Sequence, residues 1–303
     1  MRFEPVRSAR IGTRIRGLLP IRLAMLVTTA AAGVIVVIDP GAANAGTVAP
    51  RVSVGRAVAD LPDPYPCPGC YRPALRSSWQ WQLQYEVDTS FDVDMYDIDG
   101  FDATAGLVQE LHDGGASVVC YLSAGSWERW RPDADRFPRR VLGTSNGWPG
   151  EKWLDIRRIG ILGPIMKARL NMCDDQGFDA VEFDNVDGYQ NDTGFRLSAA
   201  DQLRYNVFLA NHAHRLGLSA VLKNDLGQLK MLVDYFDFVL NEQCHQYHEC
   251  DRLDRFVAAG KAVFGVEYRL KRSAFCPQSN AHDFNFLKKR LGLGPWRRAC
   301  RPD

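Results

Sequence analysis

The chain has 303 residues and a formal net charge of +1 at pH 7. Hydrophobic residues make up 46% of it and charged residues 24%, a composition that suits a single large globular domain. Arginines in the first 22 residues supply much of the positive charge. The remainder is therefore near neutral, which excludes a basic nucleic-acid-binding surface, and we expect no nucleic acid among the partners.

The first 45 residues have the pattern of a secretory signal peptide. An arginine-rich segment is followed by an apolar run from Leu23 to Ile38, and Ala43-Asn-Ala45 resembles a cleavage site. We predict cleavage after Ala45 and a secreted protein. An uncleaved anchor is the alternative and would be the only contact with a membrane. The apolar run is shorter than the roughly 20 residues that a spanning helix needs.

Residues 46–76 are rich in proline and glycine and lack periodicity, so we expect an extended N-terminal arm. Residues 77–303 then form the folded domain. All eight cysteines follow the predicted signal, and an oxidising destination predicts disulfides. The expected pairs are Cys244–Cys250, Cys276–Cys300 and Cys67–Cys70. Cys120, in an apolar strand, and Cys173, in a helix, are interpreted as buried thiols.

Strands and helices alternate along the domain. Helices are predicted at 104–112, 159–174 and 251–259, and another begins at the capping residue Ser198, with Asp201 at its third position, and ends at Gly217. The predicted strands are 79–84, 93–98, 117–122, 152–156, 180–184, 219–224, 236–242 and 262–268. Eight strands separated by helices predict an α/β fold, a single-domain (β/α)8 TIM barrel. A doubly wound sheet would need a glycine-rich phosphate loop after its first strand, and none is present.

Polar and aromatic side chains gather at the C-terminal ends of these strands and in the loops beyond, where barrel enzymes build their sites. We expect these groups to bind substrate, and they are Gln82, Asp97, Asp99, Ser123, Trp127, Asp155, Asn185, Asp187, Tyr189, Lys223, Asn224, Glu267 and Tyr268. His245 and His248 lie in a short loop that no regular element fixes, so we expect neither a metal ion nor a cofactor. Carboxylates, amides and aromatic rings are the groups that bind and cleave polysaccharides.

Seven motifs in order resemble glycoside hydrolase family 114, typified by endo-α-1,4-polygalactosaminidases. They span most of the domain, and they are Trp79-Gln-Trp-Gln82, Tyr96-Asp-Ile-Asp99, Cys120-Tyr-Leu-Ser-Ala-Gly-Ser126, Trp153-Leu-Asp-Ile156, Glu182-Phe-Asp-Asn-Val-Asp-Gly-Tyr189, Leu222-Lys-Asn-Asp225 and Asn241-Glu-Gln-Cys244. The resemblance implies a TIM barrel that cleaves polysaccharide rich in α-1,4-linked galactosamine. It also implies that Asp184 and Glu242 are the paired catalytic acids. Phe183 departs from the family pattern, but its side chain should face away from the site.

Strand alternation agrees with this pair. Asp184 ends the fifth predicted strand and Glu242 the seventh, and side chains from alternate barrel strands share a layer. Glu182 lies on the same face two residues deeper, where we expect a buried, hydrogen-bonded supporting acid. Two alternatives remain, namely a non-catalytic carbohydrate-binding barrel and a hydrolase of a different polysaccharide. The presence of both acids favours the enzyme.

Overall fold

The computed structural model describes residues 61–302. The predicted signal peptide and the first part of the arm lie outside these residues. Nine of the strands described here form or flank the barrel, and β4 and β5 are set apart from it. The strands are β1 (Trp79–Gln82), β2 (Met95–Asp99), β3 (Ser117–Ser123), β4 (Ser126–Glu128), β5 (Glu151–Trp153), β6 (Ala180–Asp184), β7 (Ser219–Lys223), β8 (Phe238–Glu242), β9 (Val263–Glu267), β10 (Asn285–Lys289) and β11 (Arg297–Ala299).

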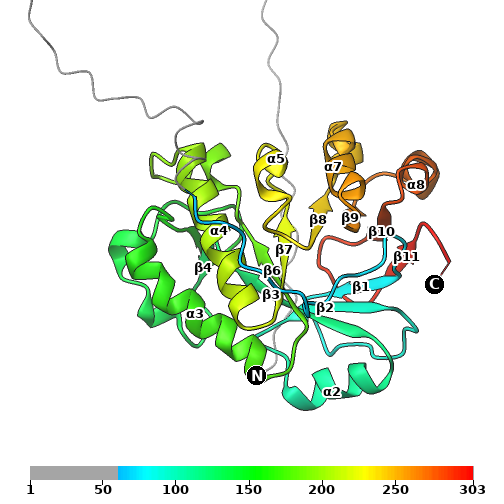
Figure 1. The fold of residues 1–303 in the computed structure, drawn as a ribbon, viewed down its shortest axis with the longest axis horizontal. Helices are drawn as coiled ribbons and strands as arrows, with labels where there is room; N and C mark the ends of the chain where they lie inside the picture. Colours follow the sequence, from blue (N-terminus) through cyan, green and yellow to red (C-terminus); the bar gives the residue numbers. More distant parts are fainter. Residues whose placement is uncertain (1–60, 303) are drawn as a thin grey trace, which may run out of the picture. The chain divides into compact units, whose positions relative to one another are not determined.

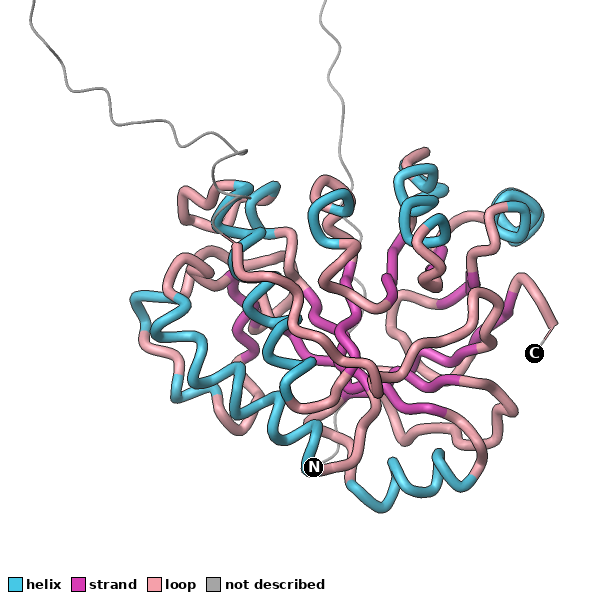
Figure 2. The backbone as a smooth tube through the Cα atoms, in the orientation of Figure 1, coloured by secondary structure: helices cyan, strands magenta, loops and turns pink. Residues whose placement is uncertain are grey.

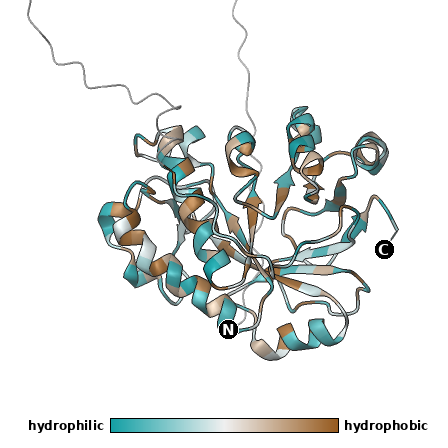
Figure 3. Cartoon of the chain, viewed as in Figure 1, coloured by the Kyte–Doolittle hydropathy of each residue, from teal (hydrophilic) through white to brown (hydrophobic). Residues whose placement is uncertain are grey.

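The α-helices lie around the strands, as Figures 1 and 2 show. They are α2 (Ala105–Asp113), α3 (Ile159–Asp175), α4 (Ala199–Arg215), α5 (Leu229–Leu232), α6 (Cys244–Tyr247), α7 (Asp254–Ala258) and α8 (Arg272–Ala281), and short 3₁₀ turns occur at Ala134–Arg136, Arg139–Val141, Gly188–Gln190 and Cys250–Leu253. Several helices carry hydrophobic and hydrophilic stripes side by side (Figure 3), as expected for helices that bury one face against the sheet. None of the described helices is long and apolar enough to cross a membrane.

Eight parallel strands form the barrel in the order β1-β2-β3-β6-β7-β8-β9-β10, and β11 pairs antiparallel with β10. Within the described residues no backbone ladder joins β10 to β1. Side chains bridge that seam instead. Trp79 Nε1 donates to the carbonyl of Asn285 at 2.9 Å, and Lys289 Nζ donates to Gln80 Oε1 at 3.1 Å. The predicted TIM-barrel fold is confirmed as a nearly closed barrel.

One predicted strand does not belong to the barrel, and one barrel strand was not predicted. The segment predicted at 152–156 is not a barrel strand, because β5 pairs antiparallel with β4 in a separate two-stranded sheet. The eighth barrel strand is β10, for which no strand was predicted from the sequence. Lys289 is buried, since its ammonium binds Gln80 and the carbonyl of Gly294.

Apolar side chains fill the lower part of the barrel interior, and polar ones lie above them. Trp79, Met95, Val221 and Phe238 belong to an interior cluster of buried residues near the N-terminal ends of the strands. A second, larger cluster lies between the strands and the surrounding helices. Because strand side chains alternate, the residues after Ala180 on the interior face of β6 are Glu182 and Asp184. The interior therefore becomes charged towards the C-terminal end.

Local signals in the sequence were accurate. Ser198 and Asp201 form the predicted capping box at the start of α4. The three expected disulfides, Cys67–Cys70, Cys244–Cys250 and Cys276–Cys300, are present. The interpretation of Cys120 and Cys173 as free thiols was wrong, because β3 and α3 pack together and the two residues form a fourth disulfide. Four disulfides are consistent with an oxidising compartment.

The described part of the arm packs at the N-terminal ends of the barrel strands. The ring of Tyr71 meets Phe238 edge-on at 6.1 Å, and the Ser219 hydroxyl donates to the Tyr71 carbonyl. Ser219 and Phe238 are the first residues of β7 and β8. The arm therefore lies at the opposite end of the barrel from the strand ends that carry the polar groups.

Candidate active site

A buried lysine lies at the centre of the polar cluster. Lys223 ends β7, and its ammonium lies 3.0 Å from Glu182 Oε1, 3.1 Å from Asp184 Oδ1 and 3.3 Å from Glu242 Oε2. Its side chain is only 2% exposed, and the ammonium stands 4.5 Å from the centre of the Trp81 ring. Burial alone would lower the pKa of Lys223, but the three carboxylates outweigh burial and raise it well above its usual value.

Asp184 ends β6 and receives hydrogen bonds from two further groups. The Tyr121 hydroxyl donates to Asp184 Oδ2 at 2.8 Å, and the Asn185 amide lies 3.3 Å from the same oxygen. Burial and the nearby Asp184 carboxylate raise the pKa of Tyr121 well above its usual value, so Tyr121 remains a donor. Asn185 has a left-handed backbone (φ 62°), and its carbonyl lies where a side chain at Gly125 would be. This close approach requires the glycine.

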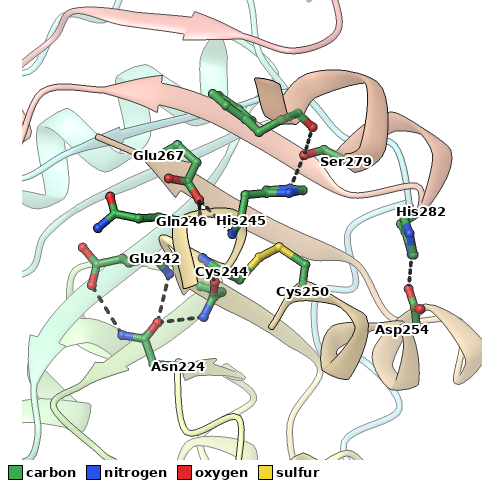
Figure 4. The surroundings of a disulfide bond; sticks show 12 residues. Asn224, Glu242, Cys244, His245, Gln246, Cys250, Asp254, Glu267, Ser279 and His282 are labelled. Carbon is green, nitrogen blue, oxygen red and sulfur yellow. Dashed lines mark hydrogen bonds and ion pairs between the residues drawn. A yellow bond between two sulfur atoms is a disulfide. The ribbon is translucent and has the colours of Figure 1, made fainter. Parts of the chain in front are cut away.

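Glu242 ends β8, and its carboxylate is held from both sides. Tyr268 donates to Oε1, and the Asn224 amide lies 3.4 Å from Oε2. Asn224 Oδ1 also accepts from the backbone N–H of Glu242 at 2.9 Å, as Figure 4 shows. Asn224 reaches this position through a left-handed backbone (φ 53°) directly after β7. The turn thus fixes the side chain at the end of the neighbouring strand.

A second pair of acids lies beneath the lysine. Glu182 and Asp97 are both fully buried, and the oxygens of Asp97 have no hydrogen-bond partner among the described residues other than the Glu182 carboxyl. Burial and the adjacent Glu182 charge raise the pKa of Asp97 well above its usual value. Burial also raises the pKa of Glu182, although Lys223 opposes it. Both shifts favour the neutral form of a carboxyl group beneath the lysine, and most strongly that of Asp97.

Asp184, Lys223 and Glu242 open into a cleft of about 830 Å³ at the C-terminal end of the barrel. Two more carboxylates line it. Burial and the nearby Asp184 raise the pKa of Asp187 to about 6. Burial also raises the pKa of Glu151, which accepts hydrogen bonds from Asn146 at 2.6 Å and Ser126 at 2.9 Å. Lys223 and Arg131 act on these two acids only as more distant charges.

The structure brings about half of the residues predicted from the sequence to this cleft. Those that line it or touch one of its paired acids are Asp184, Glu242, Asn185, Asp187, Lys223, Asn224 and Tyr268. Of Trp127, Trp130 and Trp148, which lie in the connection after β3, only Trp148 lines the cleft. Trp127 donates its indole N–H to the Ala134 carbonyl instead.

The other predicted binding residues lie elsewhere, because neighbouring groups bind them. Arg131 binds Asp99 through two hydrogen bonds of 2.7 Å, and Arg157 binds Asp155 in the same way at 2.6 and 2.9 Å. Four others form hydrogen bonds that hold loops or turns together. Gln82 binds the carbonyls of Gln84 and Glu86, and Ser123 binds Ser126. Tyr189 binds Asp225, and Glu267 binds the backbone of His245 and Gln246. Asp97 lies below the cleft with Glu182.

Several cleft residues were missed. Tyr121 and Trp81 sit on the interior face of β3 and β1, and strand alternation from Ser123 and Trp79 could have found both. Tyr85, Glu151 and Tyr247 come from loops or short elements, where the sequence carries no periodic signal.

Cys244, His245 and Cys250 come within 4.8 Å of one another, a spacing that could suit a metal ion. The two sulfurs are bonded to each other, however, and the His245 ring lies 2.7 Å from the Ser279 hydroxyl (Figure 4). These three residues therefore hold together the turn after Glu242 and do not offer free ligands.

The chain matches the model of glycoside-hydrolase family GH114 over residues 67–303. The solved structure of Aspergillus fumigatus Ega3 in complex with galactosamine is 39% identical, covers 76% of this chain and 97% of that chain, and has a TM-score of 0.73. The glycoside hydrolase domain of PelA from Pseudomonas aeruginosa is 15% identical, covers 73% and 98%, and has a TM-score of 0.59, which shows a shared fold. No protein with a curated description matches the chain.

Proposed function

This chain belongs to glycoside hydrolase family 114 and is a glycoside hydrolase, and we propose that it is a secreted enzyme that cleaves α-1,4-linked galactosamine-rich polysaccharide within the chain. One observation carries the proposal. Asp184 and Glu242, the two acids that match the family motifs, share contact with Lys223 and face an open cleft. The bound galactosamine in the Ega3 structure supports the choice of sugar.

The surroundings of the two acids give them different roles. Asp184 accepts a hydrogen bond from Lys223 at one carboxylate oxygen and from Tyr121 at the other, so donors hold both oxygens in place for attack. The single positive charge of Lys223 is shared among three carboxylates, and Glu182 is the nearest of them. We therefore assign Asp184 as the nucleophile. Glu242, whose side chain is 26% exposed and is the more exposed of the two, is assigned as the general acid and base.

The reaction then proceeds by retention. Glu242 protonates the glycosidic oxygen while an Asp184 oxygen attacks the anomeric carbon, and the bond to the leaving sugar breaks. Glu242, now ionised, takes a proton from water, which attacks the glycosyl–Asp184 ester and releases the product. Lys223 Nζ lies 3.1 Å from Asp184 Oδ1 and 3.3 Å from Glu242 Oε2. The distance between these two oxygens therefore cannot exceed the sum of the two contacts. That limit lies just below the roughly 6.5 Å at which inverting geometries begin.

The charge of the cleft suits a cationic polymer. Asp187 and Glu151 face the cleft, and Lys223 and Arg131 act on them only as more distant charges, so the ammonium groups of a deacetylated chain can supply closer ones. Opposite charge also concentrates such a polymer at the cleft. Four disulfides support a secreted location, and mass analysis of the secreted protein should find Gly46 as its first residue.

The test is product analysis on a panel of defined α- and β-linked amino-sugar polymers. We expect oligosaccharides of mixed length from α-1,4-polygalactosamine, with the anomeric configuration retained in the first product. Asp184→Asn and Glu242→Gln should each lower kcat by at least about a thousandfold while the protein stays folded and binds polymer. Preferential cleavage of another polymer would overturn the proposed substrate, and an active Asp184→Asn variant would overturn the assigned nucleophile.

A further inference from the structure

Exposed aromatic side chains gather at the cleft. The large hydrophobic residues that are exposed in the described structure are Tyr65, Tyr85, Trp130, Trp148, Tyr247 and Leu291, and all but Tyr65 and Trp130 line this one cleft. A large exposed apolar side chain is unfavourable in water unless something covers it in use. Their concentration at one site indicates a ligand that presents apolar faces there.

Tyr85 gives the strongest sign of a functional position. Its side chain is 84% exposed, and its backbone has φ 69°, a conformation that bulky residues rarely adopt. Two contacts impose this turn. The buried Gln82 amide donates to the carbonyls of Gln84 and Glu86, on either side of Tyr85, and Leu83 N–H donates to the Leu293 carbonyl. The chain thus accepts backbone strain to hold an exposed ring at the cleft, and such strain concentrates at functional sites.

The three rings surround the paired acids. Asp184 and Glu242 end β6 and β8, on either side of β7, and Tyr85 follows β1, which lies opposite β7 in the strand order. Trp148 belongs to the connection after β3, next to β6, whereas Tyr247 lies in α6 after β8. A chain that crosses the cleft past the acids therefore meets Trp148 on one side, Tyr247 on the other and Tyr85 across from them.

We propose that Tyr85, Trp148 and Tyr247 are stacking platforms for sugar units on both sides of the cleaved bond, and that they make the enzyme selective for long chains. This inference rests on the proposed function. A galacto-configured pyranose has one face of C–H groups that packs on an aromatic ring, and its ammonium can add a cation–π attraction. Platforms on both sides require sugars on both sides, which favours cleavage within a chain over release of terminal units.

The experiment compares Tyr85→Gly, Trp148→Ala and Tyr247→Ala with the matched control Trp130→Ala. Trp130 is as exposed as Trp148, at 52%, and does not line the cleft. KM is measured on α-1,4-polygalactosamine and on oligosaccharides of increasing length. Each platform variant should raise KM for the polymer by roughly three- to tenfold, with kcat changed less than twofold and with the loss growing with chain length. Trp130→Ala should leave KM unchanged.

Tyr85→Gly separates binding from folding. Glycine adopts positive φ without strain, so its Tm should equal or exceed that of the native protein even as KM rises. If the native enzyme cleaves the polymer and the three variants keep its KM, or if Trp130→Ala shows the same loss, the platforms are refuted and the proposed function stands. If the native protein neither cleaves nor binds polygalactosamine, both proposals fail.

Discussion

Replacing Lys223 by methionine should make the enzyme require a higher pH. The methionine keeps most of the side-chain volume but removes the charge that lies 3.1 Å from Asp184 and 3.0 Å from Glu182. Two unit charges about 4 Å apart near a protein surface interact by about 4 kcal/mol. Asp184 is 19% exposed, so solvent screening reduces the lost attraction to about 3 kcal/mol. The acidic limb of the kcat/KM profile should therefore move to higher pH, because the carboxyl groups around Lys223 lose the cation that favours their charged forms.

Stability should change with pH in a defined direction. Burial already raises the pKa of Glu182, and loss of Lys223 removes the charge that opposes this rise. A carboxyl group whose pKa is raised in the folded state holds protons that the unfolded chain releases, so stability falls as pH increases. The variant should therefore be closest to the native protein at pH 5. At pH 8 it should lose about 3–5 kcal/mol, the usual cost of removing one partner from a buried ion pair.

Lys289→Met is the matched control. Lys289 is also a buried barrel lysine, but its ammonium binds the neutral oxygens of Gln80 and Gly294. It should lower Tm without moving the acidic limb. Both variants are assayed by kcat/KM from pH 4 to 9 and by thermal unfolding at pH 5 and 8. If Lys223→Met lowers kcat/KM by the same factor at every pH, the lysine only holds the geometry, and the electrostatic reasoning is refuted.

Three further results are expected. Replacing Cys244 and Cys250 by serine should lower the free energy of unfolding by only about 2–3 kcal/mol, because the disulfide closes a short loop. It should lower kcat strongly, because the bond holds the turn beyond Glu242. A fall in Tm with full activity would contradict this. A chain that begins at Arg76 should have a lower Tm but keep kcat/KM while folded, since the arm packs at the far end of the barrel; lost turnover would argue against that placement. Burial raises the pKa of Asp225 to about 9, so native stability should fall as pH rises from about 4 to 9, and Asp225→Asn should flatten this decline in thermal unfolding.

Features set by neighbouring residues could be predicted from the sequence. The capping box of Ser198 and Asp201 and the disulfide of Cys244 and Cys250 involve residues close in the chain, so their chemistry is visible in a short window. The Cys120–Cys173 bond joins residues 53 positions apart, and it depends on how α3 packs against β3. No local pattern carries that information. The burial of Lys289 was missed for the same reason.

Which polar residues line the cleft was hard to predict from the sequence. A carboxylate at the end of a strand can face the cleft or bind a neighbouring arginine, and the sequence does not say which. Arg131 is 32 residues from Asp99, and its position depends on the whole connection after β3. Asp155 could have been excluded, because Arg157 follows it by only two positions. Aromatic residues such as Tyr85 depend on turn geometry, which here required a left-handed backbone that a tyrosine does not predict.

The sequence placed Asp184 and Glu242 close together in space, as observed, although it gave an incorrect strand count. The sequence placed them on the fifth and seventh strands, but they end the fourth and sixth strands of the barrel, because β5 lies outside it. The inference did not depend on those numbers. It required only one strand between the two, with an interior-facing residue at its end, and β7 supplies both the spacing and Lys223. Relative order along a barrel survives the gain or loss of a strand elsewhere, so a site argued from neighbouring strands is more secure than the complete topology.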